Sequence, residues 1–107
     1  MEQCFISGTL LYDAEKCVNV NGTPYVRFTV TCGDEDFDGR TQFTHYMCTT
    51  YSMNAARFKK GDQVIVSGHQ KIRKIRDEKG NVIDVRISVI VYQVSAGYTA
   101  AEKKLRK

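Results

Sequence analysis

The chain has no tryptophan, one proline and no long apolar run, and each absence narrows what the protein can be. A helix that spans a bilayer needs roughly 20 consecutive apolar residues, and no stretch of this 107-residue sequence approaches that. The N-terminus, Met1 to Cys4, lacks the basic and then apolar pattern of a secretory signal. We therefore expect a single domain in the cytoplasm, with no membrane partner.

The sequence also lacks the spacings that metal sites and catalytic sites need. Its four cysteines include no Cys-x-x-Cys pair, and its two histidines are not at ligand spacing. Free thiols buried in strands are the interpretation we prefer. His45 and Cys48 would point to opposite faces of one strand, which argues against a nucleophile pair. The acidic loop 34–39 imitates the start of a calcium loop, but the twelfth position holds His45 instead of glutamate. The sequence predicts no catalytic residue, no metal and no cofactor, and a protein that is not an enzyme.

What the chain does have is the pattern of a small β-barrel. Strand-like segments run over about 3–12, 23–32 and 41–50, and a long hairpin supplies two more, the second over 82–92. Residues 52–58 resemble a short helix that Ser52 caps and Gly61 ends. Gly8 and Gly68 lie inside strands, where a small barrel must bend. The pattern predicts an all-β OB-fold, a five-stranded Greek-key barrel with one short helix between strands 3 and 4. An SH3-like barrel is the alternative.

The positive charge is concentrated rather than spread. The formal net charge is +4, yet segment 71–79 alone carries five cations and two acids. Segment 102–107 is also basic, with four cations and one acid. A strand pair that projects positive charge is a common way to hold a nucleic-acid backbone.

The candidate binding residues follow from this charge and from the aromatic side chains. We expect phosphate contacts from the cations of the hairpin and of two polar strand faces, namely Lys71, Arg73, Lys74, Arg76, Lys79, Arg27 and Arg86. Residues 71 and 73 share one face of their strand, and 74 and 76 share the other. We expect base stacking from exposed aromatic rings, for which the candidates are Phe37, Phe43, Tyr46 and Tyr51. The acids around Phe37 would repel phosphate.

Several motifs carry a resemblance to one family over roughly residues 4–95. They are Phe5-Ile6-Ser7-Gly8-Thr9-Leu10, the segment from Asn21 to Val30, the segment from Phe58 to Gly68, and Asp77 to Gly80. The most specific is Lys-Lys-Gly-Asp-x-Val-x-Val-x-Gly, from Lys59 to Gly68. The chain resembles bacterial single-stranded DNA-binding proteins, with primosomal replication protein B as the runner-up.

The resemblance implies an OB-fold, a homo-oligomer (dimer or tetramer) and binding of single-stranded DNA without sequence specificity. It further implies a role in DNA replication, recombination or repair, replication proteins as further partners, and a bacterial, nucleoid-associated location. An adaptor that binds DNA weakly and replication proteins chiefly is the alternative. We expect a binding domain over 1–98 and a short basic tail over 99–107. The family commonly stacks bases on tryptophan and ends in an acidic tail, and this chain departs from both.

Overall fold

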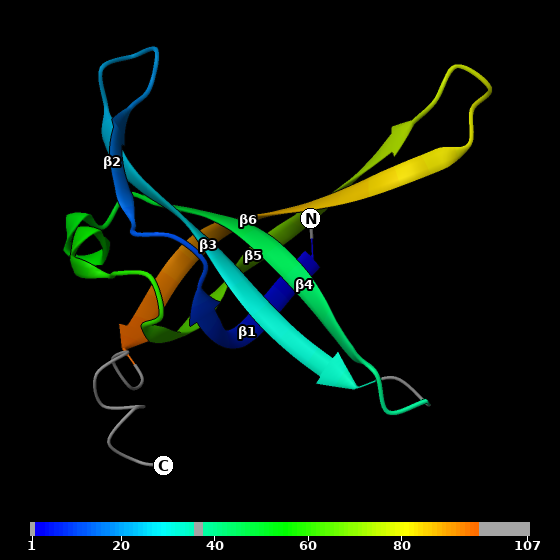
Figure 1. Cartoon of the computed structure of the whole chain (residues 1–107). Helices are drawn as coiled ribbons and strands as arrows, with labels where there is room; N and C mark the ends of the chain where they lie inside the picture. The colour runs from blue at the N-terminus through cyan, green and yellow to red at the C-terminus, as the bar shows by residue number, and fades with distance from the viewer. Residues whose placement is uncertain (1, 36–37, 97–107) are drawn as a thin grey trace.

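In the computed structural model, which describes residues 2–35 and 38–96, six strands form one sheet that closes into a barrel (Figure 1). The strands are β1 (Glu2–Leu10), β2 (Glu15–Val18), β3 (Pro24–Glu35), β4 (Thr41–Thr50), β5 (Gln63–Arg76) and β6 (Val82–Ala96). Their order is β1-β5-β6-β4-β3-β2, and an extra pairing of Thr9 and Leu10 with β3 closes the barrel. The predicted all-β OB-fold is confirmed.

Two details of the prediction need correction. The described residues contain six strands instead of five, because Glu15–Val18 forms a short strand that pairs with β3. Between β4 and β5 lies η1 (Met53–Arg57), a single turn of 3₁₀ helix in the predicted place. Ser52 stands at its N-terminus, but the Ser52 side chain makes no capping hydrogen bond. The turn is held by burial of Ala55 instead, and by backbone bonds such as Phe58 N–H to the carbonyl of Ala55.

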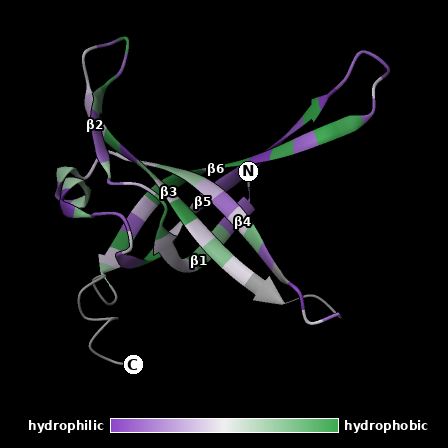
Figure 2. Cartoon of the chain, in the orientation of Figure 1, coloured by the Kyte–Doolittle hydropathy of each residue, from purple (hydrophilic) through white to green (hydrophobic). Residues whose placement is uncertain are grey.

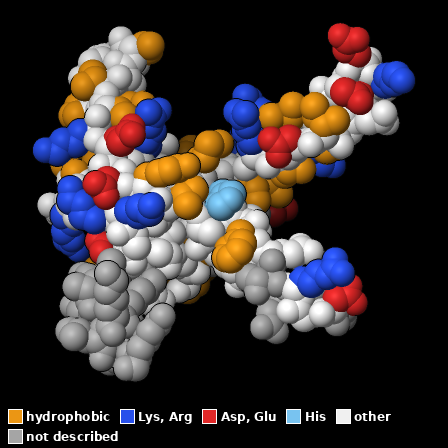
Figure 3. Space-filling view, in the orientation of Figure 1, with side chains coloured by type: hydrophobic (Ala, Val, Ile, Leu, Met, Phe, Trp, Pro, Cys, Tyr) orange, Lys and Arg blue, Asp and Glu red, His pale blue; other side chains and the backbone are white. Residues whose placement is uncertain are grey.

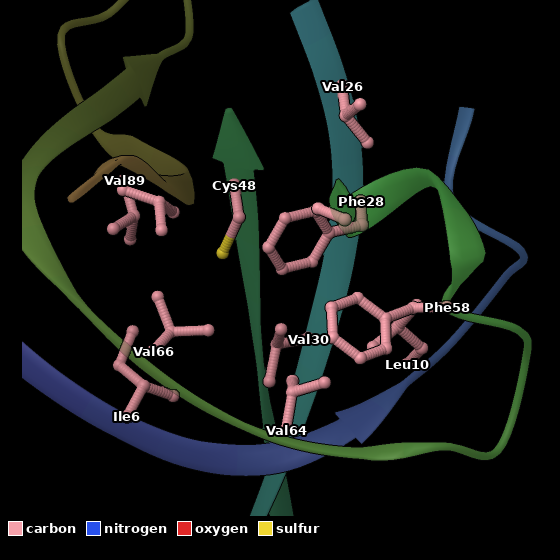
Figure 4. Close-up of a cluster of buried hydrophobic side chains, with 12 residues drawn as sticks. Ile6, Leu10, Val26, Phe28, Val30, Cys48, Phe58, Val64, Val66 and Val89 are labelled. Atoms are coloured by element: carbon pink, nitrogen blue, oxygen red, sulfur yellow. The ribbon is translucent and has the colours of Figure 1, made fainter. Parts of the chain in front are cut away.

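The core forms on one face of the sheet because apolar side chains alternate with polar ones along the strands. Figure 2 shows this alternation along the ribbon. On β3, Val26, Phe28 and Val30 are buried, and their side chains meet those of the neighbouring strands inside the barrel (Figure 4). On β6 the same alternation is present near the barrel, where Val89 and Val91 are buried and Ile90 and Tyr92 are exposed.

Gly68 allows two strands to approach closely at the bend of the barrel. A Cβ atom at this position would lie 2.1 Å from the carbonyl oxygen of Ile90 on β6. The register between β5 and β6 shifts at the same place, between Ser67 and Gly68. Such a bulge lets the long hairpin curve, so that its lower part closes the barrel and its upper part projects away (Figure 1).

All four cysteines are free, as expected, but only one is buried. Cys48 lies in the core, while Cys4, Cys17 and Cys32 are half-buried. Burial raises the pKa of the Cys48 thiol to about 12, with smaller contributions from Cys4 and Cys32. Cys48 is therefore a protonated, space-filling side chain rather than a reactive thiol.

Candidate nucleic-acid interface

The face of the sheet that points away from the core is continuous across four strands. One row crosses it through directly paired residues, namely Thr29, Met47, Ser88 and Lys71. A second row, one step toward the β2–β3 hairpin, contains Arg27, Thr49, Ile90 and His69. We call this surface, from β3 through β4 and β6 to β5, the outer face. Figure 3 shows it with hydrophobic, basic and histidine side chains close together.

The hairpin of β5 and β6 brings some predicted cations to this face and directs others away. Arg73 lies directly opposite Arg86, and Lys71 opposite Ser88, so these three cations share the outer face. Lys74 pairs with Val85 on the other face of the hairpin, in line with exposed Ile72. The prediction that Lys71 and Arg73 lie on one face of the strand and Lys74 on the other is therefore confirmed.

The two remaining hairpin cations lie near the tip. Arg76 donates a 3.0 Å hydrogen bond from Nη1 to the carbonyl of Gly80, which ties its side chain to the turn. Lys79 is exposed in the turn itself, where Gly80 adopts a φ of 84°. Both lie far along the projecting arm rather than over the barrel (Figure 1).

Of the four predicted stacking residues, the structure exposes two. Phe43 on β4 is 65% exposed on the outer face, and Tyr51, just after β4, is 59% exposed. Tyr46 is not brought to this face, because it pairs with Ile87 on the core side and packs against the core. Phe37 lies outside the described residues.

An open hollow of about 480 Å³ lies at the β2–β3 end of the outer face. Tyr12, Tyr25, Arg27 and Met47 are among the residues that line it. Tyr25 also meets Tyr51 edge to face, with ring centroids 6.5 Å apart. Aromatic rings beside a cation are the arrangement on which nucleobases stack while phosphates are neutralised.

Arg27, which the sequence analysis assigned to phosphate, forms an ion pair with Glu15 on β2. Its Nε and Nη2 atoms donate hydrogen bonds of 3.2 and 2.9 Å to Oε2 of Glu15. The hydrogen bond and the nearby negative charges raise the pKa of the Arg27 guanidinium. Arg27 is therefore always charged, but in the free protein it already has an anionic partner.

Tyr12, Tyr25 and Met47 were not among the predicted binding residues, although one feature of the sequence indicates Tyr25. Tyr25 and Arg27 alternate with the buried Val26 and Phe28, which places them on the outer face. No comparable signal exists for Met47, because residues 43–50 mix threonine, aromatic and sulfur-containing side chains on both faces.

The described residues give no support for a metal site or a membrane-spanning helix. Within residues 2–35 and 38–96, no group of three His, Cys, Asp or Glu side chains could hold a metal ion. No helix in this part of the chain has the length and apolarity to cross a membrane. The Thr31 hydroxyl and His45 Nδ1 lie 2.9 Å apart on the outer face.

An OB barrel whose outer face carries exposed aromatic rings, arginine and lysine defines the class of single-strand nucleic-acid-binding proteins. The model of the single-strand binding protein family matches residues 1–96, and the chain belongs to this family. The predicted family is thereby confirmed, and with it single-stranded DNA binding as the function. The primosomal runner-up gains no support from the comparisons.

Two solved structures show the same fold. The small single-stranded DNA-binding protein from Streptomyces coelicolor is 20% identical with a TM-score of 0.66, over 89% of this chain and 93% of that chain. A deletion mutant of the single-stranded DNA-binding protein from Thermus aquaticus is 14% identical with a TM-score of 0.64. That match covers 95% of this chain and 53% of the other. A search of curated proteins finds no match.

Proposed function

We propose that single-stranded DNA crosses the outer face from the hollow at Tyr25 and Arg27, over Met47, to Arg86 and Arg73 on the hairpin. The observation that carries this proposal is the unbroken outer row from β3 to β5, which joins the hollow to the cationic arm. Bases would stack on the exposed rings while arginine and lysine neutralise phosphates. Neither contact depends on base identity, so binding would be independent of sequence.

The biological role in this proposal is to coat and protect single strands during replication, recombination or repair. It requires neither catalysis nor a cofactor, since stacking and charge neutralisation act on bound DNA without chemical change. The proposal places the protein in the bacterial cytoplasm, on nucleoid DNA. The domain within 1–98 carries the binding surface, and the basic segment 99–107 lies outside the described residues.

Assembly with further copies of the chain belongs to the same proposal. One edge of β1 pairs with β5 from Glu2 to Thr9, and within the described residues the other edge has no partner strand over 2–8. Phe5 on β1 and Tyr92 on β6 are exposed, and both line a hollow of about 360 Å³ that extends over β1, β5 and β6. An unpaired strand next to exposed apolar side chains favours contact with another copy, as a dimer or tetramer.

The assembly has its own test, because sedimentation velocity measures mass without DNA. Wild-type protein should sediment as a dimer or tetramer, and Phe5→Glu should shift it toward monomer by placing a charge in the contact. Monomeric wild-type protein across the micromolar range would remove assembly from the proposal and leave DNA binding untouched.

The binding proposal is tested with a fluorescently labelled oligo(dT) and a matched duplex, by anisotropy at low and moderate salt. Wild-type protein should prefer the single strand, with affinity that falls as salt rises. Tyr51→Leu should weaken binding by about 1–3 kcal/mol through lost stacking. Tyr46→Phe is the matched control, because Tyr46 faces the core, and its affinity should stay at the wild-type value. Equal affinity for duplex and single strand would refute the proposal.

A further inference from the structure

The Glu15–Arg27 ion pair is set by the register of two strands rather than by chance contact. Glu15 lies directly opposite Arg27 in the β2–β3 pairing. Both hydrogen bonds from the guanidinium go to the same oxygen, Oε2, at 3.2 and 2.9 Å. The side chains stay accessible, at 62% exposure for Arg27 and 59% for Glu15.

The pair lies on the proposed DNA path. Both residues line the hollow of about 480 Å³ together with Tyr12 and Tyr25, and Arg27 is next to Thr49 in the outer row. The hollow has a second acid, Asp13, but its Oδ1 accepts a 2.8 Å hydrogen bond from the backbone N–H of Lys60. Glu15 is therefore the carboxylate directed at the cation of this part of the path.

A carboxylate and a backbone phosphate bind the same donors of a guanidinium. DNA that reaches Arg27 must take the place of the Glu15 carboxylate or share the cation with it. An exposed ion pair is weak and screened by salt, so a phosphate held in place by neighbouring contacts can displace it. After the exchange, the Glu15 carboxylate remains near the phosphate and repels it.

We propose that the Glu15 carboxylate competes with DNA phosphate for Arg27. Glu15 occupies the guanidinium in the free protein, DNA phosphate displaces it, and Glu15 thereby lowers the affinity for single-stranded DNA. The inference rests on the proposed DNA path. If Glu15 instead had a positioning role and held Arg27 ready for DNA, loss of the Glu15 charge would weaken DNA binding or leave it unchanged.

Glu15→Gln distinguishes these roles, because glutamine has the same shape and keeps an oxygen acceptor but loses the charge. Competition predicts that E15Q binds oligo(dT) about two- to five-fold more tightly, the range expected from an exposed ion pair. The plot of log affinity against log salt should become steeper by up to about 0.7, which corresponds to one more neutralised phosphate on a single strand. Unchanged or weaker binding by E15Q overturns the inference.

Glu2→Gln controls for the change in net charge, because it removes the same charge from β1. The Glu2 carboxylate accepts a 3.4 Å hydrogen bond from Gln70, which is uncharged. E2Q should show less than half of the change in log affinity that E15Q shows. An equal gain in both variants would mean that net charge, and not the Arg27 contact, controls affinity, and would overturn the inference.

Arg27→Gln and the double variant complete the cycle. R27Q should weaken binding, and adding E15Q to R27Q should then give no gain, because the cation for which the two anions compete is absent. If R27Q binds like the wild type, the inference and the Arg27 end of the proposed path fail, while binding of single-stranded DNA stands. If wild-type protein does not prefer single strands over duplex, the proposed function itself fails. Thermal melts of each variant confirm that the fold is intact.

Discussion

Arg73 and Lys74 are neighbours in sequence on opposite faces of one strand, and this makes them a matched pair of perturbations. Arg73 faces Arg86 across the hairpin on the outer face, whereas Lys74 pairs with Val85 on the other face. Arg73→Gln and Lys74→Gln remove the same charge from almost the same place. The general attraction of DNA to the basic hairpin should therefore fall equally in both variants. Any difference in affinity between the two variants reports direct contact of DNA with one face of the hairpin.

The size of the effect follows from the cross-strand geometry. Like charges directly opposite each other in a sheet destabilise it by roughly 0.2–1 kcal/mol. Arg73→Gln should therefore increase the free energy of unfolding of the DNA-free protein by about 0.5 kcal/mol. The same substitution removes an exposed charge-assisted phosphate contact, which corresponds to about 1 kcal/mol of binding. Binding should weaken about five-fold, and the salt slope should fall by about 0.7.

Urea unfolding measures the first quantity, and anisotropy titration of labelled oligo(dT) at four salt concentrations measures the second. Opposite signs for stability and affinity in Arg73→Gln would show that weaker binding does not come from unfolding. Lys74→Gln should stay within about two-fold of the wild-type affinity, since its side chain points away from the outer face. If Lys74→Gln loses as much affinity as Arg73→Gln, or more, then DNA does not follow the outer face of the hairpin.

Three further substitutions test the core and the stacking surface. Gly68→Ala should lower the free energy of unfolding by about 3 kcal/mol, because its Cβ would lie 2.1 Å from the Ile90 carbonyl oxygen. Urea unfolding measures this change, and wild-type stability in the variant would contradict the close approach of the two strands. Burial raises the pKa of the Cys48 thiol from 9.0 to about 12, so the thiol loses its proton in the unfolded chain before it does so in the folded one. The free energy of unfolding should therefore fall as the pH rises above about 9. This loss, about 1.4 kcal/mol per pH unit from pH 9 to about 12, should be absent from Cys48→Ala in matched urea titrations. Phe43→Leu should weaken oligo(dT) binding by about 1–3 kcal/mol in anisotropy titrations while melting like the wild type, and an unchanged affinity would place the DNA away from this end of β4.

The elements of the fold that depend on local pattern were predictable. Val26, Phe28 and Val30 alternate with polar residues, so their burial follows from the period of a strand. Asn21-Gly22 and the segment 77–81 marked two hairpin turns, and glycine takes a positive φ in both. The face shared by Lys71 and Arg73 followed from the same period.

The short elements were harder to predict because nothing local requires them. Glu15–Val18 forms β2 by pairing with β3 across the Asn21-Gly22 turn, but four residues with little burial show no clear strand alternation of their own. The helix expected at 52–58 is a single 3₁₀ turn, because a segment this short is shaped by packing at its ends rather than by helix propensity.

The sequence by itself determined that the chain is a small β-barrel, where its core strands lie and which hairpin carries positive charge, because alternation, turn residues and charge are local properties. Only the tertiary structure decided which residues meet on the outer face. Tyr46 turns inward and Met47 outward because the register of β4 sets Tyr46 beside Val30 and Ile87 and sets Met47 beside Thr29 and Ser88. Arg27 meets Glu15 because β2 pairs with β3 in one register. The pairing of β4 with β6 joins segments distant in sequence and depends on closure of the barrel, and this pairing makes the outer face continuous from β3 to β5.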